Sequence, residues 1–166
     1  MIEMMLVMVV MTVAVTMLAS TVSSSTRLGP VQSQRARASE AVREKLEYIR
    51  TMPHEQIWAL FNNDPSDDPA GPGTAPGPDF TVTELSPLDS DPDGQVGRIR
   101  FPGTPTNLRE DVNDPVLGMP RDLNMNLVID SAPISEYAIL PVEVSVEWVG
   151  GGEDRRFASH TMFIAP

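Results

Sequence analysis

An apolar run opens the chain and carries a single charge near its start. In "MIEMMLVMVVMTVAVTMLAS" the only charged side chain is Glu3, and residues 4–26 are 23 consecutive uncharged residues. At about 1.5 Å per residue, a helix of that length spans roughly the 30 Å hydrocarbon core of a bilayer. The pattern therefore predicts a membrane-spanning helix half over residues 1–26.

A second helical pattern follows, and it has two faces. Gly29-Pro30 is expected to interrupt the helix, because proline lacks a backbone donor and disfavours helix in the residue before it. In "VQSQRARASEAVREKLEYIRTM", apolar residues recur every three or four positions, which predicts an amphipathic helix that Pro53 ends or turns. This half, residues 27–61, needs a packing partner for its apolar stripe. The stripe consists of Ala38, Val42, Leu46, Ile49 and Met52.

Beyond residue 61 the apolar period changes from helical to alternating. "NNDPSDDPAGPGTAPGPD" is a loop of turn-forming residues, and the segments after it alternate as half-buried strands do. We expect an α+β fold in which residues 62–166 form a loop-rich antiparallel head, packed on the amphipathic half of the long helix. The expected strands are Phe80–Leu85 and Gln95–Phe101, joined across "DSDPDG", then Leu123–Ile129, and the hairpin arms "PVEVSVEW" and "RFASHTMFI".

Charge is distributed unevenly and limits the partners of the head. Residues 27–50 hold six basic and three acidic side chains, whereas residues 51–166 hold six basic and nineteen acidic ones. With Glu3, the sums of +3, −13 and −1 give the net charge of −11. Because an acidic surface repels phosphate backbones, we expect no direct nucleic-acid binding by the head. The chain has no cysteine, which excludes disulfides and thiolate metal sites.

The apolar run has one alternative interpretation, a cleavable signal peptide. "LASTVSSS" supplies small residues for cleavage, but the start carries Glu3 where a signal peptide has positive charge. The basic residues after the run, beginning with Arg27, would place the following part in the cytoplasm by the positive-inside rule. A basic segment upstream would reverse that orientation.

The order of these elements resembles the type IV pilin and type II secretion pseudopilin superfamily. The resemblance rests mainly on "MIEMMLVMVVMTVAVTMLAS", which is similar to the family's opening of Leu or Ile, then Glu, then an unbroken apolar run. "AVREKLEYIRTMP" and the terminal "VEVSVEWVGGGEDRRFASHTMFI" resemble the minor pilins and minor pseudopilins. The resemblance implies a pilin-like fold, a single-pass inner-membrane location with the head outside the cytoplasm, and later a periplasmic or surface filament.

The resemblance also implies a role for Glu3 and a set of partners. In the family, the matching glutamate pairs with the N-terminal amine of a neighbouring subunit during filament assembly. The implied partners are other pilin or pseudopilin subunits, the inner-membrane assembly platform and, if an upstream leader exists, a prepilin peptidase. Family precursors carry a short basic leader and gain a methylated first residue, whereas here Met1 directly precedes Ile2-Glu3. From the residues alone, Glu3 also suits the first turn of a helix at the membrane interface, where the helix dipole favours an acid.

One segment of the head matches part of a calcium-loop template. In "DSDPDGQVGRIR", Asp89, Asp91 and Asp93 take positions one, three and five, followed by glycine at position six. Position twelve, which should be glutamate, is Arg100. Calcium is the one metal we consider, and an ordinary tight turn explains the same residues.

No catalytic pattern accompanies these segments, and we expect no enzyme and no other cofactor. His54 and His160 lack a second ligand at metal-binding spacing, so we interpret both as structural or surface residues. Gly150-Gly151-Gly152 is interpreted as a hairpin turn, because no lysine and no helix start follow as in a phosphate loop.

Two functions therefore stand as hypotheses. The first is a minor pilin or pseudopilin, anchored in the membrane and built into a pilus or secretion pseudopilus through its helix. The second is a single-span anchored protein whose β-rich head binds a ligand or envelope partner without any filament. A weaker third is a secreted domain released by signal cleavage.

Overall fold

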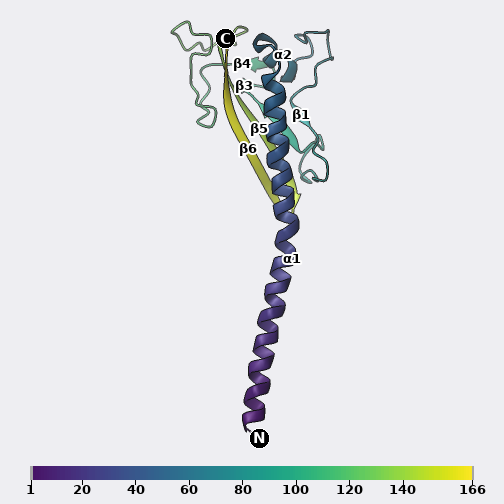
Figure 1. Ribbon diagram of the computed structural model, residues 1–166. Coiled ribbons are helices and arrows are strands. Elements are labelled where there is room, and N and C mark those ends of the chain that lie inside the picture. The colour runs from purple at the N-terminus through teal and green to yellow at the C-terminus, as the bar shows by residue number, and fades with distance from the viewer. Residues whose placement is uncertain (1, 166) are drawn as a thin grey trace.

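The computed structural model describes residues 2–165, and within the segment 22–28 it describes only the backbone. Helix α1 runs from Ile2 to Arg50, with Pro30 inside it. Its 49 residues reach roughly 70 Å at the usual rise, and its N-terminal half extends alone below the head (Figure 1). The expected interruption at Gly29-Pro30 is therefore wrong. Proline removes a single helical hydrogen bond, and the turns on both sides keep theirs.

The helical part of the chain ends as a series of short turns. Backbone N–H groups of Thr51 and Met52 donate to the carbonyls of Tyr48 and Ile49, and Pro53 then precedes the 3₁₀ turn η1, His54–Gln56. Helix α2, Ile57–Phe61, follows directly. The prediction that Pro53 ends the long helix or forces a new turn is confirmed.

The head contains a four-stranded antiparallel sheet with strand order β1-β2-β5-β6. A separate pair, β3 and β4, forms a two-stranded sheet, so the small antiparallel sheet expected from the sequence is confirmed in outline. The bounds are Asp79–Phe80 for β1, Gly97–Arg100 for β2, Gly103–Thr104 for β3, Asn107–Leu108 for β4, Ile139–Gly150 for β5 and Glu153–Ile164 for β6.

The terminal hairpin is the longest regular part of the head. Strands β5 and β6 have twelve residues each and pair without a gap from Ile139↔Ile164 to Gly150↔Glu153. Gly151 and Gly152 close it with φ angles of 68° and 83°. Both angles lie in the left-handed region that a two-residue type I′ turn requires, which is why glycine is needed there. The predicted glycine turn is confirmed.

The core lies between α1 and the inner face of the sheet. The predicted helix stripe is buried, with Ala38, Val42 and Ile49 fully inaccessible and Met52 packed at its margin. This stripe faces the alternate residues of β5 that the pattern assigns to one face. Those residues are Leu140, Val142, Val144, Val146 and Trp148, each at most 2% exposed.

Two predicted strands are wrong. Only Asp79–Phe80 of the first is a strand, because Glu84 takes a φ of 66° and Leu85 N–H bonds back to the Val82 carbonyl. Residues 123–129 form an irregular loop, in which Met125 and Leu127 have φ angles of 60° and 70°. A residue in the left-handed conformation cannot continue a strand. The alternation of apolar residues was therefore not enough to predict a strand correctly at either place.

Candidate functional site

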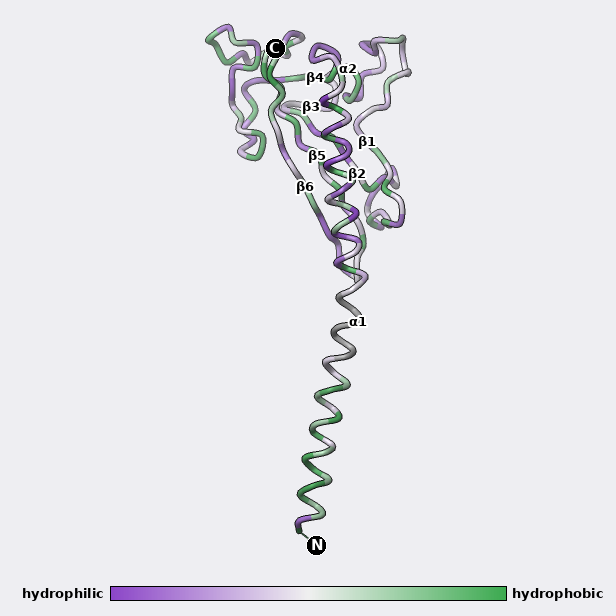
Figure 2. The backbone as a smooth tube through the Cα atoms, in the orientation of Figure 1, coloured by the Kyte–Doolittle hydropathy of each residue, from purple (hydrophilic) through white to green (hydrophobic). Residues whose placement is uncertain are grey.

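The N-terminal half of α1 presents a long row of exposed apolar side chains. Residues Ile2–Thr21 have a mean hydropathy of 2.3 and none of this segment is buried, so by length and composition the helix can cross a membrane. Figure 2 shows this half mainly in the green of hydrophobic residues, with pale stretches and a hydrophilic first turn, whereas the half beside the sheet has mixed colours. An apolar surface of this extent requires lipid or other protein around it.

The polar side chains within this half are adapted to an apolar environment. The hydroxyls of Thr12, Thr16 and Thr21 donate to helix carbonyls three or four residues earlier, at 2.7–2.9 Å. A hydroxyl satisfied by its own helix leaves no unpaired donor in hydrocarbon. These three hydroxyls therefore stay hydrogen-bonded when lipid or other helices surround the segment.

Glu3 is the exception within this surface. It lies in the first turn of α1 and is exposed. The nearest basic residue along the chain is Arg27, beyond the 23 uncharged residues 4–26. If the helix enters an apolar environment up to its first turn, an unpaired Glu3 carboxylate costs about 2.5–3.5 kcal/mol there, and a cationic partner would remove this cost.

Of the three predicted calcium residues, Asp91 and Asp93 make other contacts, and Asp89 is exposed. Asp93 Oδ2 pairs with Arg98 Nη2 at 2.6 Å and Oδ1 accepts the Gln95 N–H at 2.7 Å. The Gln95 hydrogen bond, with Arg98, lowers the pKa of Asp93 below its ordinary value. Asp91 accepts the Asp93 N–H at 3.3 Å. Among residues 2–165 no three acidic or histidine side chains gather as metal ligands, so the calcium prediction gains no support.

A second loop, "DLNMNLVID" at residues 122–130, escaped the sequence analysis. Asp122, Asn124, Asn126 and Asp130 stand at positions one, three, five and nine of the same template. Leu127 takes the left-handed conformation at position six, where the template has glycine. The match is one of spacing and backbone conformation alone. A search for asparagine as well as aspartate would have found it.

This loop is held by carboxylates that accept backbone donors. Glu110 is fully buried, and its two oxygens accept the N–H groups of Leu123, Asn124 and Asp130 at 2.7–3.1 Å. Asp122 accepts two more N–H groups within the loop. The tip therefore keeps a fixed shape while its apolar side chains remain in solvent. These are Met125, Leu127, Val128 and Ile129, with Leu127 94% exposed.

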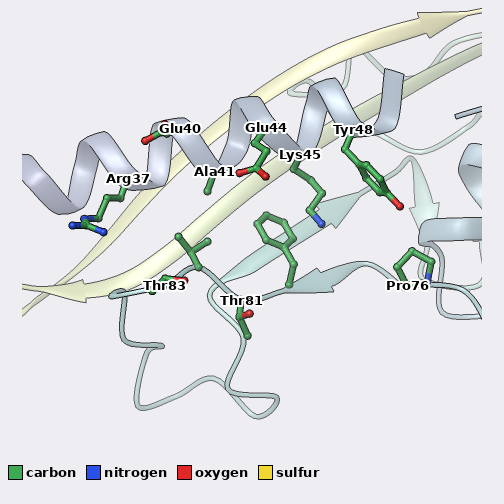
Figure 3. A pocket seen from close by; sticks show the side chains of 11 residues that line it. Arg37, Glu40, Ala41, Glu44, Lys45, Tyr48, Pro76, Thr81 and Thr83 are labelled. Atoms are coloured by element: carbon green, nitrogen blue, oxygen red, sulfur yellow. The ribbon is translucent and has the colours of Figure 1, made fainter. Parts of the chain in front are cut away.

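A groove of about 530 Å³ separates α1 from the segment after β1 (Figure 3). Lys45 points into it from the helix, and its Nζ lies 4.6 Å from the Phe80 ring centroid and 5.6 Å from that of Tyr48. Burial lowers the pKa of Lys45, and the nearby Glu44 partly opposes this shift. Arg37 closes one end of the groove through its 2.7 Å ion pair with Glu84. The contacts hold helix and loop together.

The outer face of the sheet carries ion pairs that connect neighbouring strands. Glu143, only 4% exposed, accepts from Arg100 at 2.6 Å and from Arg156 at 2.9 Å. Arg100 also pairs with Asp114, and Arg156 with Glu147. Hydrogen bonding to Arg100 lowers the pKa of Asp114. These charges are paired with one another across strands, as in a stabilising network.

The two histidines lie apart. The His54 ring lies tilted against that of Tyr137, with 5.0 Å between the ring centroids, and the Tyr137 hydroxyl donates to the His54 carbonyl at 2.7 Å. His160 is exposed on the outer face of β6, opposite Glu143. The structural interpretation of His54 agrees with these contacts.

Comparison of the chain with protein-family models, with curated proteins and with solved structures gives no match. The arguments for function therefore come from the molecule itself.

Proposed function

We propose that the protein is a membrane-anchored structural subunit of a pilus-like filament, of the minor pilin or pseudopilin kind. The observation that supports this proposal is the exposed apolar half of α1, continuous with a helix half that is rigidly packed on the head. In this proposal the head stands outside the cytoplasm while the helix stores the subunit in the inner membrane.

Assembly would transfer the helix from lipid to a bundle of similar helices. Because lipid is as apolar as a helix bundle, burial of apolar side chains gives little preference for either. A charge discriminates between the two. Glu3 gains a partner only when a cationic group, such as a neighbour's N-terminal amine, meets it in the bundle. Glu3 would therefore fix the axial position of one helix against the next.

Replacement of Glu3 tests this role. Glu3→Ala and Glu3→Gln remove the charge, and the second keeps the size of the side chain. We expect both variants to fractionate with membranes as the parent does, because removal of a charge eases insertion. We expect both to be lost from sheared or cross-linked filaments.

The alternative function gives the opposite result. A single-span anchored protein with a ligand-binding head needs no charge at this position. Unchanged recovery of Glu3→Ala in higher-order assemblies, or the absence of any assembly of the parent protein, would leave the anchored binding protein as the better account.

A further inference from the structure

Strand β6 forms a long free edge of the main sheet. It is the last strand in the order β1-β2-β5-β6, and in the part of the chain that the structure describes no strand lies on its outer side (Figure 1). The opposite edge strand, β1, has only two residues, whereas β6 has twelve. Of the two edge strands of this sheet, β6 therefore offers by far the longer backbone edge.

The pairing of the hairpin shows which backbone groups face outward. A two-residue turn begins with a hydrogen-bonded pair, here Gly150↔Glu153, and such pairs then alternate along the ladder. The bond from Ala165 N–H to the Ala138 carbonyl continues the same alternation at the other end. The even-numbered residues of β6 consequently direct both N–H and C=O away from β5. They are Asp154, Arg156, Ala158, His160, Met162 and Ile164.

Most of this edge has few of the features that protect edge strands in soluble proteins, which are charged side chains (lysine above all), proline, bulges or very short length. The charges of β6 stand on its first four residues, Glu153 to Arg156, and the remaining edge is formed by residues 157–164. Strand β6 contains neither proline nor lysine, and its register with β5 is unbroken over the whole strand. From Phe157 to Ile164 the only ionisable side chain is that of His160. Exposed apolar side chains accompany the free backbone, with Met162 44% and Ile164 65% accessible.

The edge is also preformed. The inner-face residues Phe157 and Phe163 pack against the core, and the paired strand β5 lies in the middle of the sheet. An added strand would therefore find its hydrogen-bonding partners already in place, without ordering a loop first.

From these observations we propose that the edge of β6 binds an extended segment of another protein, which adds to the sheet as an antiparallel or parallel fifth strand. Backbone groups at alternate residues recognise the backbone of the partner, while Ala158, Met162 and Ile164 select small or apolar side chains on the outer face.

Charge identifies the kind of partner. Residues 51–166 carry a net charge of −13, from six basic and nineteen acidic residues. A second copy of this head would carry the same net charge, and the repulsion between two acidic heads opposes their association. The occupant is therefore a different chain that is basic around its extended segment. This proposal is independent of the filament proposal, because strand addition does not require Glu3.

Ala158→Pro tests the edge directly. Proline at this outward-facing position removes one edge N–H and blocks strand addition, but it leaves the ladder with β5 intact, as edge prolines do. Ala158→Val is the matched control, because it changes the side chain and keeps the donor. The probe is an eight-residue peptide of alternating threonine and valine with lysine at both ends, added to the full chain in detergent. Thermal unfolding of both variants checks that the head is intact.

We expect the peptide to bind the parent and the valine variant, and to slow amide exchange at Arg156, Ala158, His160 and Met162. The affinity for the peptide should fall about tenfold in the proline variant. A peptide with glutamate in place of the terminal lysines should bind the parent protein more weakly than the lysine peptide does. Absence of protection at these amides, equal binding by the proline variant, or a concentration-dependent dimer of the protein in place of peptide binding would each overturn the proposal.

Discussion

The two halves of helix α1 have opposite relations to the rest of the molecule. Val42, in the C-terminal half, is fully buried against the sheet, whereas Val9, in the N-terminal half, is 63% exposed. Both lie in one uninterrupted helix. The buried half repeats apolar residues on one face, while the exposed half is apolar all around. A helix that is apolar on every side is typical of a membrane span or of a helix among other helices. The difference therefore separates the half that packs on the head from the half that is long and apolar enough to cross a membrane.

The strongest test of this comparison is a charge in the buried half. Val42→Asp places a carboxylate among apolar groups without a partner, and we expect it to destabilise the head by about 4 kcal/mol or more. Urea unfolding followed by the fluorescence of Trp58 and Trp148 measures the loss. A cooperative transition at the parent's midpoint would show that this face does not support the head.

The same substitution in the other half should act on the membrane instead. For Val9→Asp we expect an insertion penalty of about 2.5–3.5 kcal/mol, because the charge lies within the hydrocarbon region. The unfolding midpoint of the head should stay unchanged, since Val9 contacts nothing there. Carbonate extraction of membranes reports the insertion. Unfolding of the head by this variant would contradict the division of α1 into two independent halves.

A third test concerns the buried carboxylate of Glu110, which holds the loop 122–130 of the head. The exposed half of α1 contains no buried carboxylate of this kind. Glu110→Gln replaces a buried carboxylate that accepts three N–H groups, and leaves one oxygen for them. We expect a loss of about 1–3 kcal/mol, with faster amide exchange concentrated at Leu123, Asn124 and Asp130. The exposed Glu136 gives the matched control, Glu136→Gln. Equal effects of the two substitutions would show that the loop does not depend on Glu110.

The smallest effect is expected at Tyr137, which connects the end of the helical part to the sheet. Its hydroxyl accepts from Trp58 N–H at 3.1 Å and donates to the His54 carbonyl, so Tyr137→Phe should cost about 1 kcal/mol. Burial raises its pKa from 10.0 to about 12, although the Trp58 N–H opposes this shift.

The raised pKa of Tyr137 predicts the direction in which the stability of the head changes with pH. Above pH 10 the unfolded chain loses the phenol proton while the folded head still holds it, so stability should fall from pH 10 to about 12. Denaturant midpoints across this range measure the effect. The part of the decline due to Tyr137 should be missing in the phenylalanine variant, and an identical decline in both proteins would assign it to other groups.

Periodicity predicted the elements in which one face packs on one partner. The helix stripe from Ala38 to Ile49 and the alternation of β5 are of this kind, and both were correct. Glycine at the hairpin turn was equally informative, since two consecutive left-handed residues are needed there.

Other elements depend on contacts that no local pattern contains. The loop 122–130 resembles a strand in its apolar spacing, but Glu110, distant in sequence, and the local Asp122 take the N–H groups that a ladder would need. Gly97 is a similar case. A Cβ atom at this position would lie 2.3–2.5 Å from atoms of the Phe80 ring, so the ring fits across the strands only because residue 97 is glycine. The local sequence pattern does not indicate this contact.

Cysteine cross-linking along the exposed half of α1 tests the central claim most directly. The chain contains no cysteine, so each single cysteine substitution from Met5 to Leu18 gives the protein one thiol, at a known position of the helix. The account predicts intermolecular disulfides at positions spaced by three or four residues, and their loss when Glu3→Ala is combined with the best position. Membrane-inserted protein that forms no disulfide at any position would contradict assembly through this helix.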